Sequence, residues 1–239
     1  MIVTVASNRR EVGKSTLAVN AVAIRALAGR SVCLIDIDPR KSSYEWSLKR
    51  QRSHIQPNIP ACAIAGKYLK DTFHKVSSRY NDILIDTDWR DSMGSRTALE
   101  VADIAIVPIA LGVESLTCLK QMTKRLKAAR ANNPGLWSIV VLVRAKGAPP
   151  AAEFEAIRRH VGNETAMALA ETVIREDQSL QIAFDEGLAV FEDKQANPES
   201  IVEMYDLYAR KEEKHHVALA FPTSKAPPKK RELRLVASA

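Results

Sequence analysis

The chain contains few of the residues that mark specialised classes of protein. Its 239 residues include 5% aromatic residues, three cysteines, nine glycines and eleven prolines. Glycine and proline are too scarce for a collagen-like or low-complexity chain, and a hydrophobic content of 46% is enough to fill a sizeable core. Cys33, Cys62 and Cys118 have neither C-x-x-C nor metal-ligand spacing, so we expect reduced thiols and no zinc site.

Long hydrophobic runs are also missing. The best candidate, residues 101–113, is interrupted by Asp103 and Pro108, and no stretch approaches the ~18 apolar residues that a membrane-spanning helix needs. The chain leads directly into the apolar segment Ile2–Ala6, without the basic leader or small-residue cleavage site of a signal peptide. We therefore expect a cytoplasmic protein without a membrane partner.

Short apolar runs alternate with longer segments of helical period. This pattern indicates repeated strand–helix units and an α/β fold, in which a mostly parallel, twisted sheet has helices on both faces. Strands are expected at residues 2–6, 32–36, 61–65, 83–86, 104–108 and 139–143, with a further short strand from residue 171. Helices are expected at residues 15–28, 68–78, 92–101, 115–131, 151–161 and 179–186, and from Pro198 to near residue 214. Gly187 would end the sixth helix, and an extended piece would follow it.

Positive charge is concentrated at the C-terminus. Residues 210–239 include eight Lys and Arg residues but only three Glu residues, in a chain with a net charge of +7. A segment rich in Lys and Pro and poor in large apolar residues cannot bury enough surface to fold. The sequence predicts one domain over residues 1–216 and a flexible, basic, Pro-containing tail over residues 217–239. Such a tail either binds a polyanion or only aids solubility.

The segment Gly13–Thr16 reads Gly-Lys-Ser-Thr and lies between the first expected strand and its helix. A loop in this position surrounds phosphates with backbone N–H groups and the helix N-terminus. Lys14 would reach the terminal phosphates, and the Ser15 hydroxyl would ligate Mg²⁺. The plainer interpretation is a helix N-terminus with a Ser cap.

Acidic residues end two of the neighbouring strands. Asp36 and Asp38 follow one strand at positions i and i+2, so both point the same way from its carboxyl end, where open parallel sheets bind ligands. Asp86 ends the strand at residues 83–86, as the carboxylate of a Walker B strand does. Asp103 lies at the amino end of a strand and is left out of the site. The three motifs together predict a nucleotide-phosphate site of the P-loop NTPase type.

With these motifs in place, the chain resembles the ParA/MinD-type deviant Walker ATPases, of the small kind without an N-terminal DNA-binding extension. The resemblance spans residues 2–208. It implies a homodimer that forms with ATP and Mg²⁺, binds DNA without sequence preference, and partitions or positions a plasmid or other cargo with a ParB-like or other adaptor protein. The segments that carry it are residues 12–16, 36–40, 86–87, 102–108, 173–175 and 183–192.

The resemblance also implies a role for each site residue. Asp38 would orient the attacking water, Lys14 would contact phosphate, and Arg9 stands in the slot of a signature Lys that crosses the dimer interface. Ser15, Asp36 and Asp86 would coordinate Mg²⁺, directly or through water. The nucleotide-binding loop would comprise Arg10, Glu11, Val12, Gly13, Lys14, Ser15 and Thr16.

Three residues of this loop depart from the family pattern, which has Lys-Gly-Gly where the chain has Arg9, Arg10 and Glu11. A guanidinium does not replace an ammonium neutrally. Glycine permits close approach to phosphate and unusual φ values, and Glu11 adds negative charge beside a triphosphate. Weak nucleotide binding, or a non-hydrolysing adaptor that binds DNA or protein constitutively, is therefore the alternative. Arg144 could stack on adenine or face solvent.

Basic residues on the helix at residues 115–131 suggest a DNA-binding surface. Its apolar positions lie opposite Lys120, Lys124 and Lys127, which share one helical face. Scattered Lys and Arg give sequence-independent, salt-sensitive affinity for phosphates, although a solvated helix face is the simpler interpretation. The predicted contacts are Lys120, Lys124, Lys127, Arg175, Arg210 and Lys211. Such binding would associate the protein with the nucleoid. A second basic cluster at residues 41–52 could face a protein partner.

Overall fold

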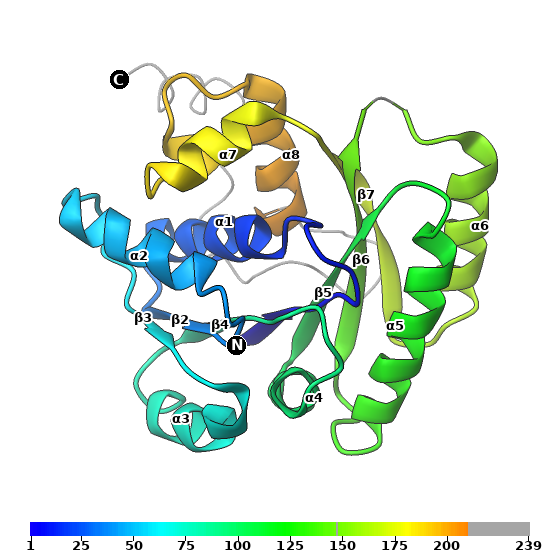
Figure 1. The fold of residues 1–239 in the computed structure, drawn as a ribbon, viewed down its shortest axis with the longest axis horizontal. Coiled ribbons are helices and arrows are strands. Elements are labelled where there is room, and N and C mark those ends of the chain that lie inside the picture. Colours follow the sequence, from blue (N-terminus) through cyan, green and yellow to red (C-terminus); the bar gives the residue numbers. More distant parts are fainter. Residues whose placement is uncertain (147, 210–239) are drawn as a thin grey trace.

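The computed structural model describes residues 1–146 and 148–209, which form a parallel sheet with helices on both faces (Figure 1). The sheet has seven strands in the order β3-β2-β4-β1-β5-β6-β7, and every adjacent pair is parallel. This confirms the predicted P-loop NTPase-like α/β fold class. The strands are β1 (Ile2–Val5), β2 (Val32–Asp36), β3 (Ala61–Ala63), β4 (Asp82–Asp86), β5 (Ile104–Ala110), β6 (Trp137–Ala145) and β7 (Met167–Arg175).

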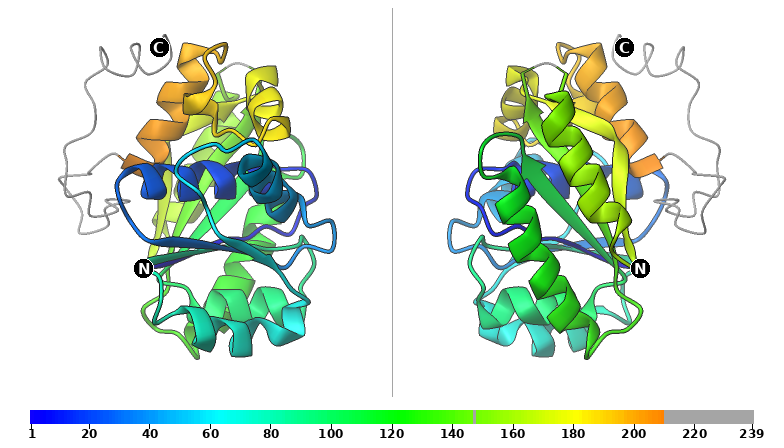
Figure 2. Two further views of the ribbon diagram at one scale, coloured as in Figure 1. Left: turned by 90° about the vertical axis from the view of Figure 1, so that its left-hand side faces the viewer. Right: turned by 90° about the vertical axis from the view of Figure 1, so that its right-hand side faces the viewer.

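The helices separate into two groups, one on each face of the sheet (Figures 1 and 2). One face is covered by α1 (Lys14–Leu27), α2 (Ser42–Arg52), α7 (Gln178–Asp185) and α8 (Pro198–Ala209). The other is covered by α3 (Leu69–Val76), α4 (Met93–Val101), α5 (Ser115–Arg130) and α6 (Ala151–Gly162). Short 3₁₀ turns lie at Gly66–Tyr68 and Val190–Glu192.

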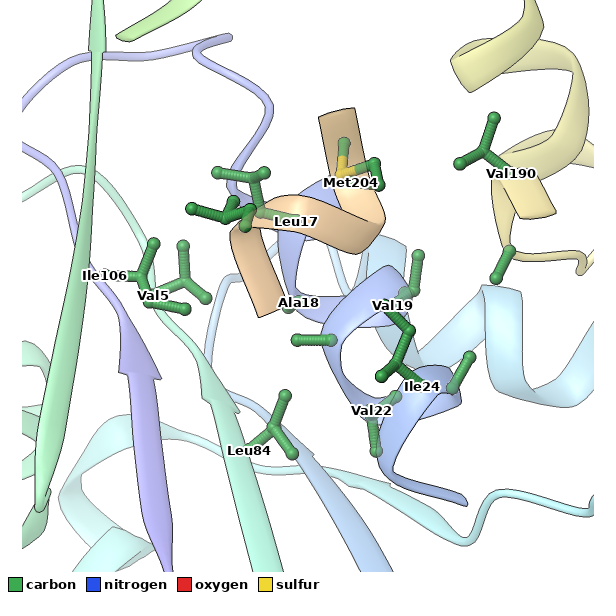
Figure 3. Close-up of a cluster of buried hydrophobic side chains, with 14 of the residues drawn as sticks. Val5, Leu17, Ala18, Val19, Val22, Ile24, Leu84, Ile106, Val190 and Met204 are labelled. Atoms are coloured by element: carbon green, nitrogen blue, oxygen red, sulfur yellow. The ribbon is translucent and has the colours of Figure 1, made fainter. Parts of the chain in front are cut away.

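Helix α1 lies at the centre of the larger hydrophobic cluster (Figure 3). Its Val19 and Val22 side chains are fully buried, as is Leu84 of β4 beneath them. Met204 of α8 and Val190 close the cluster from above. Burial of each such side chain contributes roughly 1.5–3 kcal/mol, so the helix that follows the phosphate loop is held firmly against the sheet.

The sequence does not predict helix α2, because its many charged residues leave no clear apolar periodicity. The helix is stabilised by tertiary contacts. Trp46 is 2% exposed and its indole N–H donates to the carbonyl of Leu188 at 3.0 Å. The Arg50 guanidinium is fully buried and pairs with the Glu192 carboxylate at 2.6 and 2.8 Å. The basic cluster at residues 41–52 is therefore not one exposed surface.

The segment after α7 turns tightly against α2. Gly187 has a φ of +75°, and a Cβ placed there would lie 2.7 Å from the backbone nitrogen of Arg50. Glycine is required both by the left-handed conformation and by this close approach. The prediction that Gly187 ends the helix is confirmed, but the extended piece expected after it is wrong, because Val190–Glu192 forms a 3₁₀ turn.

The C-terminal predictions extend beyond the described residues. Helix α8 begins at Pro198 as expected and is described to Ala209. The boundary at residue 216, the tail over residues 217–239 and the predicted DNA contacts Arg210 and Lys211 all lie outside the part of the chain that the structure describes. Within the described residues, no helix combines the length and apolar character that crossing a membrane requires.

Candidate nucleotide site

The loop between β1 and α1 has the backbone of an anion-binding loop. Gly13 precedes the helix with a φ of 77°, and its carbonyl accepts the first helical hydrogen bond, from the Leu17 N–H, at 2.9 Å. Glu11 also has a positive φ, of 55°. A left-handed conformation is free for glycine but costs a non-glycine residue about 1–2 kcal/mol. The loop therefore has two residues in the left-handed conformation, and the backbone of one of them, Glu11, is strained.

Arg144 holds this loop from the end of β6. Its guanidinium donates to the Glu11 carbonyl at 2.8 Å and to the Glu176 carboxylate at 2.6 Å. The Arg144 side chain is 49% exposed, so it faces solvent as one of the two interpretations of the sequence expected, although its guanidinium is bound to the protein. Stacking on adenine stays a prediction. Among the described residues, no cation forms an ion pair with the Glu11 carboxylate, so its charge remains at the mouth of the site.

Lys14 points into the interior beneath the loop. The residue is 4% exposed, and its ammonium donates to the Arg9 carbonyl at 3.3 Å. Burial lowers the pKa of Lys14, and the nearby carboxylates of Asp86 and Asp38 oppose that shift. The ammonium is therefore held close to the two acidic strand ends that the sequence placed in the site.

Asp86 is the most unusual ionisable group of the site. Both of its carboxylate oxygens are buried, and neither has a hydrogen-bond partner among the residues that the structure describes. Burial, followed by the charge of Asp36, raises the pKa of Asp86 to about 7. The hydroxyls of Ser15 and Ser43 counter this shift, although neither forms a hydrogen bond of good geometry with the carboxylate. A buried carboxylate left without a partner is costly, which fits a group that receives a cation or its water shell.

Asp36 is fully engaged in positioning helix α2. One carboxylate oxygen accepts from the Ser43 hydroxyl at 2.8 Å and from the Tyr44 N–H at 3.0 Å, and the other accepts from the Asp38 N–H at 2.9 Å. Burial raises the pKa of Asp36, and these hydrogen bonds oppose the rise. Its contacts suit a role in shaping the site and, through water, in the surroundings of a metal ion.

No group of three or more His, Cys, Asp or Glu side chains within the described residues could hold a metal ion. The site instead has the donor set that Mg²⁺ uses with nucleotides, in which one or two carboxylates and a hydroxyl act together with phosphates and waters. The unpartnered Asp86 carboxylate and the Ser15 hydroxyl fit that requirement.

Asp38 is held by its neighbour Arg40. Its carboxylate accepts from the Arg40 backbone N–H at 2.9 Å and from the guanidinium at 3.3 and 3.2 Å. Burial favours the neutral acid, but the Arg40 contacts outweigh it and the pKa of Asp38 is lowered. Asp38 is therefore ionised but paired.

A cavity of about 520 Å³ opens from the phosphate loop toward β7, α7 and α8. Its polar end is formed by residues 11–17 together with Arg40 and Ser42. Beyond the loop the cavity has an apolar part, beside which residues 175–178 and Gln181 add polar groups. The sequence did not predict this part of the lining as a site. A polar loop next to an apolar part suits a nucleotide, with phosphates at the loop and the base against the apolar side chains. The apolar lining comprises Val143, Ile174, Leu180, Phe184 and Met204.

Arg9 and Arg10 do not line this cavity. The Arg9 backbone N–H donates to the Ser7 hydroxyl at 3.2 Å. The Arg10 guanidinium lies 4.8 Å from the ring centre of Trp89, in the loop after β4, and Arg90 lies 6.0 Å from the same ring. Stacking of this kind ties the phosphate loop to the loop that follows Asp86. Of the predicted nucleotide-binding segment, residues 11–16 line the cavity.

The predicted DNA contacts that the structure describes are spread over different elements. Lys120 and Lys124 are exposed on α5, whereas Lys127 pairs with Glu164 at 2.8 Å. Arg175 lies on the opposite face of the sheet, at the cavity, where it pairs with Glu199 and, at 3.0 Å, with Glu203. Arg175 therefore lies apart from the exposed lysines of α5. The DNA-binding role itself stays a prediction.

A doubly covered parallel sheet, with a Gly-Lys-Ser-Thr loop at the carboxyl end of its central strand, defines the P-loop NTPase-like α/β class. The chain belongs to the family of CobQ/CobB/MinD/ParA nucleotide-binding domains, whose model matches residues 3–190. None of the curated proteins is significantly similar to the chain.

Several solved structures share this fold at low sequence identity. A putative plasmid partition protein of Borrelia burgdorferi bound to AMPPNP has a TM-score of 0.64 at 17% identity, covering 86% of this chain and 95% of its own. The septum site-determining protein MinD of Pyrococcus horikoshii with Mg-ADP has a TM-score of 0.63 at 17% identity, covering 86% and 93%. Apo McdA of Cyanothece has a TM-score of 0.63 at 15% identity, covering 79% and 91%.

Proposed function

We propose that this protein is an ATPase that partitions or positions a cargo, with ATP and Mg²⁺ bound in the cavity between the phosphate loop and α7. The observation that carries the proposal is the unpartnered, buried Asp86 carboxylate beside Lys14 and Ser15. Such a group is unfavourable in an empty site and is stabilised when a cation and phosphates complete its surroundings. The family, and the nucleotides named in two of its structural neighbours, support it.

Each residue of the site has a separate task in this proposal. The backbone N–H groups at the start of α1 and the Lys14 ammonium bind phosphate oxygens. Ser15 and Asp86 hold Mg²⁺, which supplies charge neutralisation on the phosphates when bound. Asp38 orients the attacking water, and the apolar end of the cavity receives the base. Positioning and charge stabilisation are most of what phosphoryl transfer requires of a protein.

The cellular role extends the same proposal. An ATP-bound homodimer would bind DNA through exposed cations such as Lys120 and Lys124, giving nucleoid association, and a ParB-like or other cargo-adaptor protein would trigger turnover. A plasmid partition protein and a MinC:MinD complex among the structures of similar fold support this class of role. The phosphate contacts would be independent of sequence and sensitive to salt.

A calorimetric titration with AMPPNP and with ADP, each with Mg²⁺, tests the nucleotide step. We expect saturable binding of both nucleotides, and loss of binding in Lys14→Ala. Asp38→Ala should keep the affinity for AMPPNP while losing hydrolysis of ATP. DNA retention that requires ATP would support the switch, whereas retention that ignores nucleotide at every salt concentration would argue against it.

The second candidate is a non-hydrolysing adaptor, and Glu11 is the observation that favours it. Its side chain adds negative charge that no described cation pairs with, and its carbonyl accepts a hydrogen bond from Arg144. An adaptor of this kind would bind DNA or protein with no dependence on ATP. Absence of nucleotide binding in the titration, together with retention on DNA, would favour this candidate.

A further inference from the structure

Four cationic side chains of the described residues line the cavity, and three of them already have partners in the protein that do not include Asp38. Lys14 is buried under the loop, Arg144 bridges the Glu11 carbonyl and Glu176, and Arg175 pairs with Glu199 and Glu203. The fourth is Arg40, in the turn between β2 and α2. It pairs with Asp38, the carboxylate to which the proposed function assigns the water.

The pairing between Arg40 and Asp38 conflicts with that assignment. Both oxygens of Asp38 accept hydrogen bonds from Arg40, and the residue is only 5% exposed. A carboxylate covered in this way presents little of its surface to a water molecule. The arrangement in the structure therefore requires Arg40 to move before Asp38 can act on water.

Arg40 is placed to move toward a phosphate. Its side chain is 50% exposed, lines the cavity beside the phosphate loop, and lies in the electrostatic field of Asp86 and Glu11. Exposed ion pairs are weak, whereas a guanidinium binds phosphate through two parallel, charge-assisted hydrogen bonds. The backbone N–H of Arg40 would still hold one oxygen of Asp38, so the carboxylate would stay in place when the guanidinium leaves.

We propose that Arg40 is a phosphate-binding and positioning residue of this site, whose guanidinium exchanges the Asp38 carboxylate for the terminal phosphate of a bound nucleoside triphosphate. The exchange adds a positive charge where Glu11 adds a negative one, and it uncovers Asp38 only when a triphosphate is present. This inference rests on the proposed function, because it presupposes that the cavity binds a nucleotide.

The chain offers a matched control for this exchange. Arg90 pairs with Asp88 in the same i, i+2 relation, at 3.2 Å, with side chains 54% and 8% exposed. Arg90 does not line the nucleotide cavity. Removal of Arg90 therefore deletes a similar arginine–aspartate pair without deleting the proposed phosphate contact.

Titration of the full chain with AMPPNP and with ADP, both with Mg²⁺, tests the assignment. In Arg40→Ala we expect AMPPNP affinity to fall by about tenfold or more and ADP affinity by less than about threefold, since only AMPPNP has the terminal phosphate. Arg40→Lys should recover part of the AMPPNP affinity, and Arg90→Ala should change neither. Free guanidinium should partly restore ATP turnover to Arg40→Ala and not to Asp38→Ala.

The possible outcomes distinguish a failure of the Arg40 assignment from a failure of nucleotide binding itself. Equal losses for both nucleotides in Arg40→Ala, or no loss, would overturn the role of Arg40 while leaving nucleotide binding intact. Faster turnover with unchanged affinity would also overturn it, because Arg40 would then only cover Asp38. If the unmodified chain binds neither nucleotide, the proposed function fails and the exchange fails with it. Arg40→Lys keeps the comparison open if the alanine variant does not fold.

Discussion

Glu11 combines a strained backbone conformation with a negative charge at the loop that is proposed to bind phosphate. Its φ of 55° is a conformation that glycine adopts freely, and its carboxylate forms no ion pair with any described residue. The strain shows that the loop geometry is imposed by its surroundings, with Arg144 bonded to the Glu11 carbonyl on one side and α1 packed on the sheet on the other.

Replacement of Glu11 by glycine should remove both penalties. We expect Glu11→Gly to raise the free energy of unfolding by about 1 kcal/mol and to strengthen nucleotide binding. Glu11→Gln, which removes only the charge, should strengthen binding without gaining stability. Denaturant unfolding and calorimetry measure the two effects. A destabilised Glu11→Gly chain would mean that flexibility gained in the unfolded state exceeds the relief of strain.

At Asp86 we expect a change that raises the stability of the folded chain to weaken metal binding. In the chain without nucleotide, Asp86→Asn removes a buried charge that lacks a hydrogen-bond partner, so we expect stability at pH 8 to rise by about 1 kcal/mol. The same change should weaken the Mg²⁺ dependence of AMPPNP binding. Thermal unfolding and titration with and without Mg²⁺ test both parts. Lower stability in Asp86→Asn would show that the carboxylate has partners that the proposed site does not include.

At the scale of elements, the start of β4 is fixed by one buried carboxylate. Asp82 is fully buried and accepts from Arg25 of α1 at 2.7 Å and from Arg30 at 3.2 Å, and the N-terminal ammonium lies 3.4 Å away. Burial alone would raise the pKa of Asp82, but the two arginines outweigh it and the pKa is lowered. The ion pairs join α1 to the strand that carries Asp86.

The lowered pKa of Asp82 gives a direction for the pH dependence of stability. A carboxylate with a depressed pKa in the folded state stabilises the protein above its unfolded pKa, and that contribution is lost as the pH falls through the folded pKa. We therefore expect Asp82→Asn to be less stable than the unmodified chain at pH 7, with a difference that shrinks below about pH 4. Unfolding curves between pH 3 and pH 7 measure it. A difference independent of pH would contradict the assignment.

At the scale of the whole molecule, the cavity and the exposed lysines of α5 lie on different faces of the sheet. The nucleotide cavity is bounded by α7 and α8, whereas the exposed lysines of α5 are on the other face of the sheet (Figures 1 and 2). If nucleotide binding and the proposed DNA binding are coupled, the coupling has to link these two faces of the sheet. The stack of Arg10 on Trp89 is one physical link between the phosphate loop and the loop that leads into α4.

The α5 face gives a prediction for DNA binding. Replacement of Lys120 and Lys124 by alanine should lower affinity for all DNA sequences and reduce the slope of log affinity against log salt by about 2. Lys70→Ala with Lys75→Ala, two exposed lysines of α3, serves as the matched control. Binding isotherms at several salt concentrations measure the slopes. Equal slopes in both double variants would exclude α5 from the DNA surface.

Most of the fold was predictable because strands buried on both faces leave continuous apolar runs in the sequence. Helix α2 was missed because Trp46 and Arg50 are held by distant residues, Leu188 and Glu192, which no local pattern relates to them. The phosphate loop and the three aspartates could be predicted from motifs that lie at strand ends. The apolar end of the cavity could not, because it forms only where α7 and α8 meet β7.

By itself, the sequence determined the strands of the sheet, most of the helices and the position of the phosphate loop, since these depend on local periodicity and on the chemistry of neighbouring residues. Only the tertiary structure decided which charges are partnered. Among the described residues, it left Asp86 without a hydrogen bond, paired Asp38 with Arg40, and paired Arg175 with Glu203. The physical reason is that burial and pairing depend on groups brought together from distant parts of the chain.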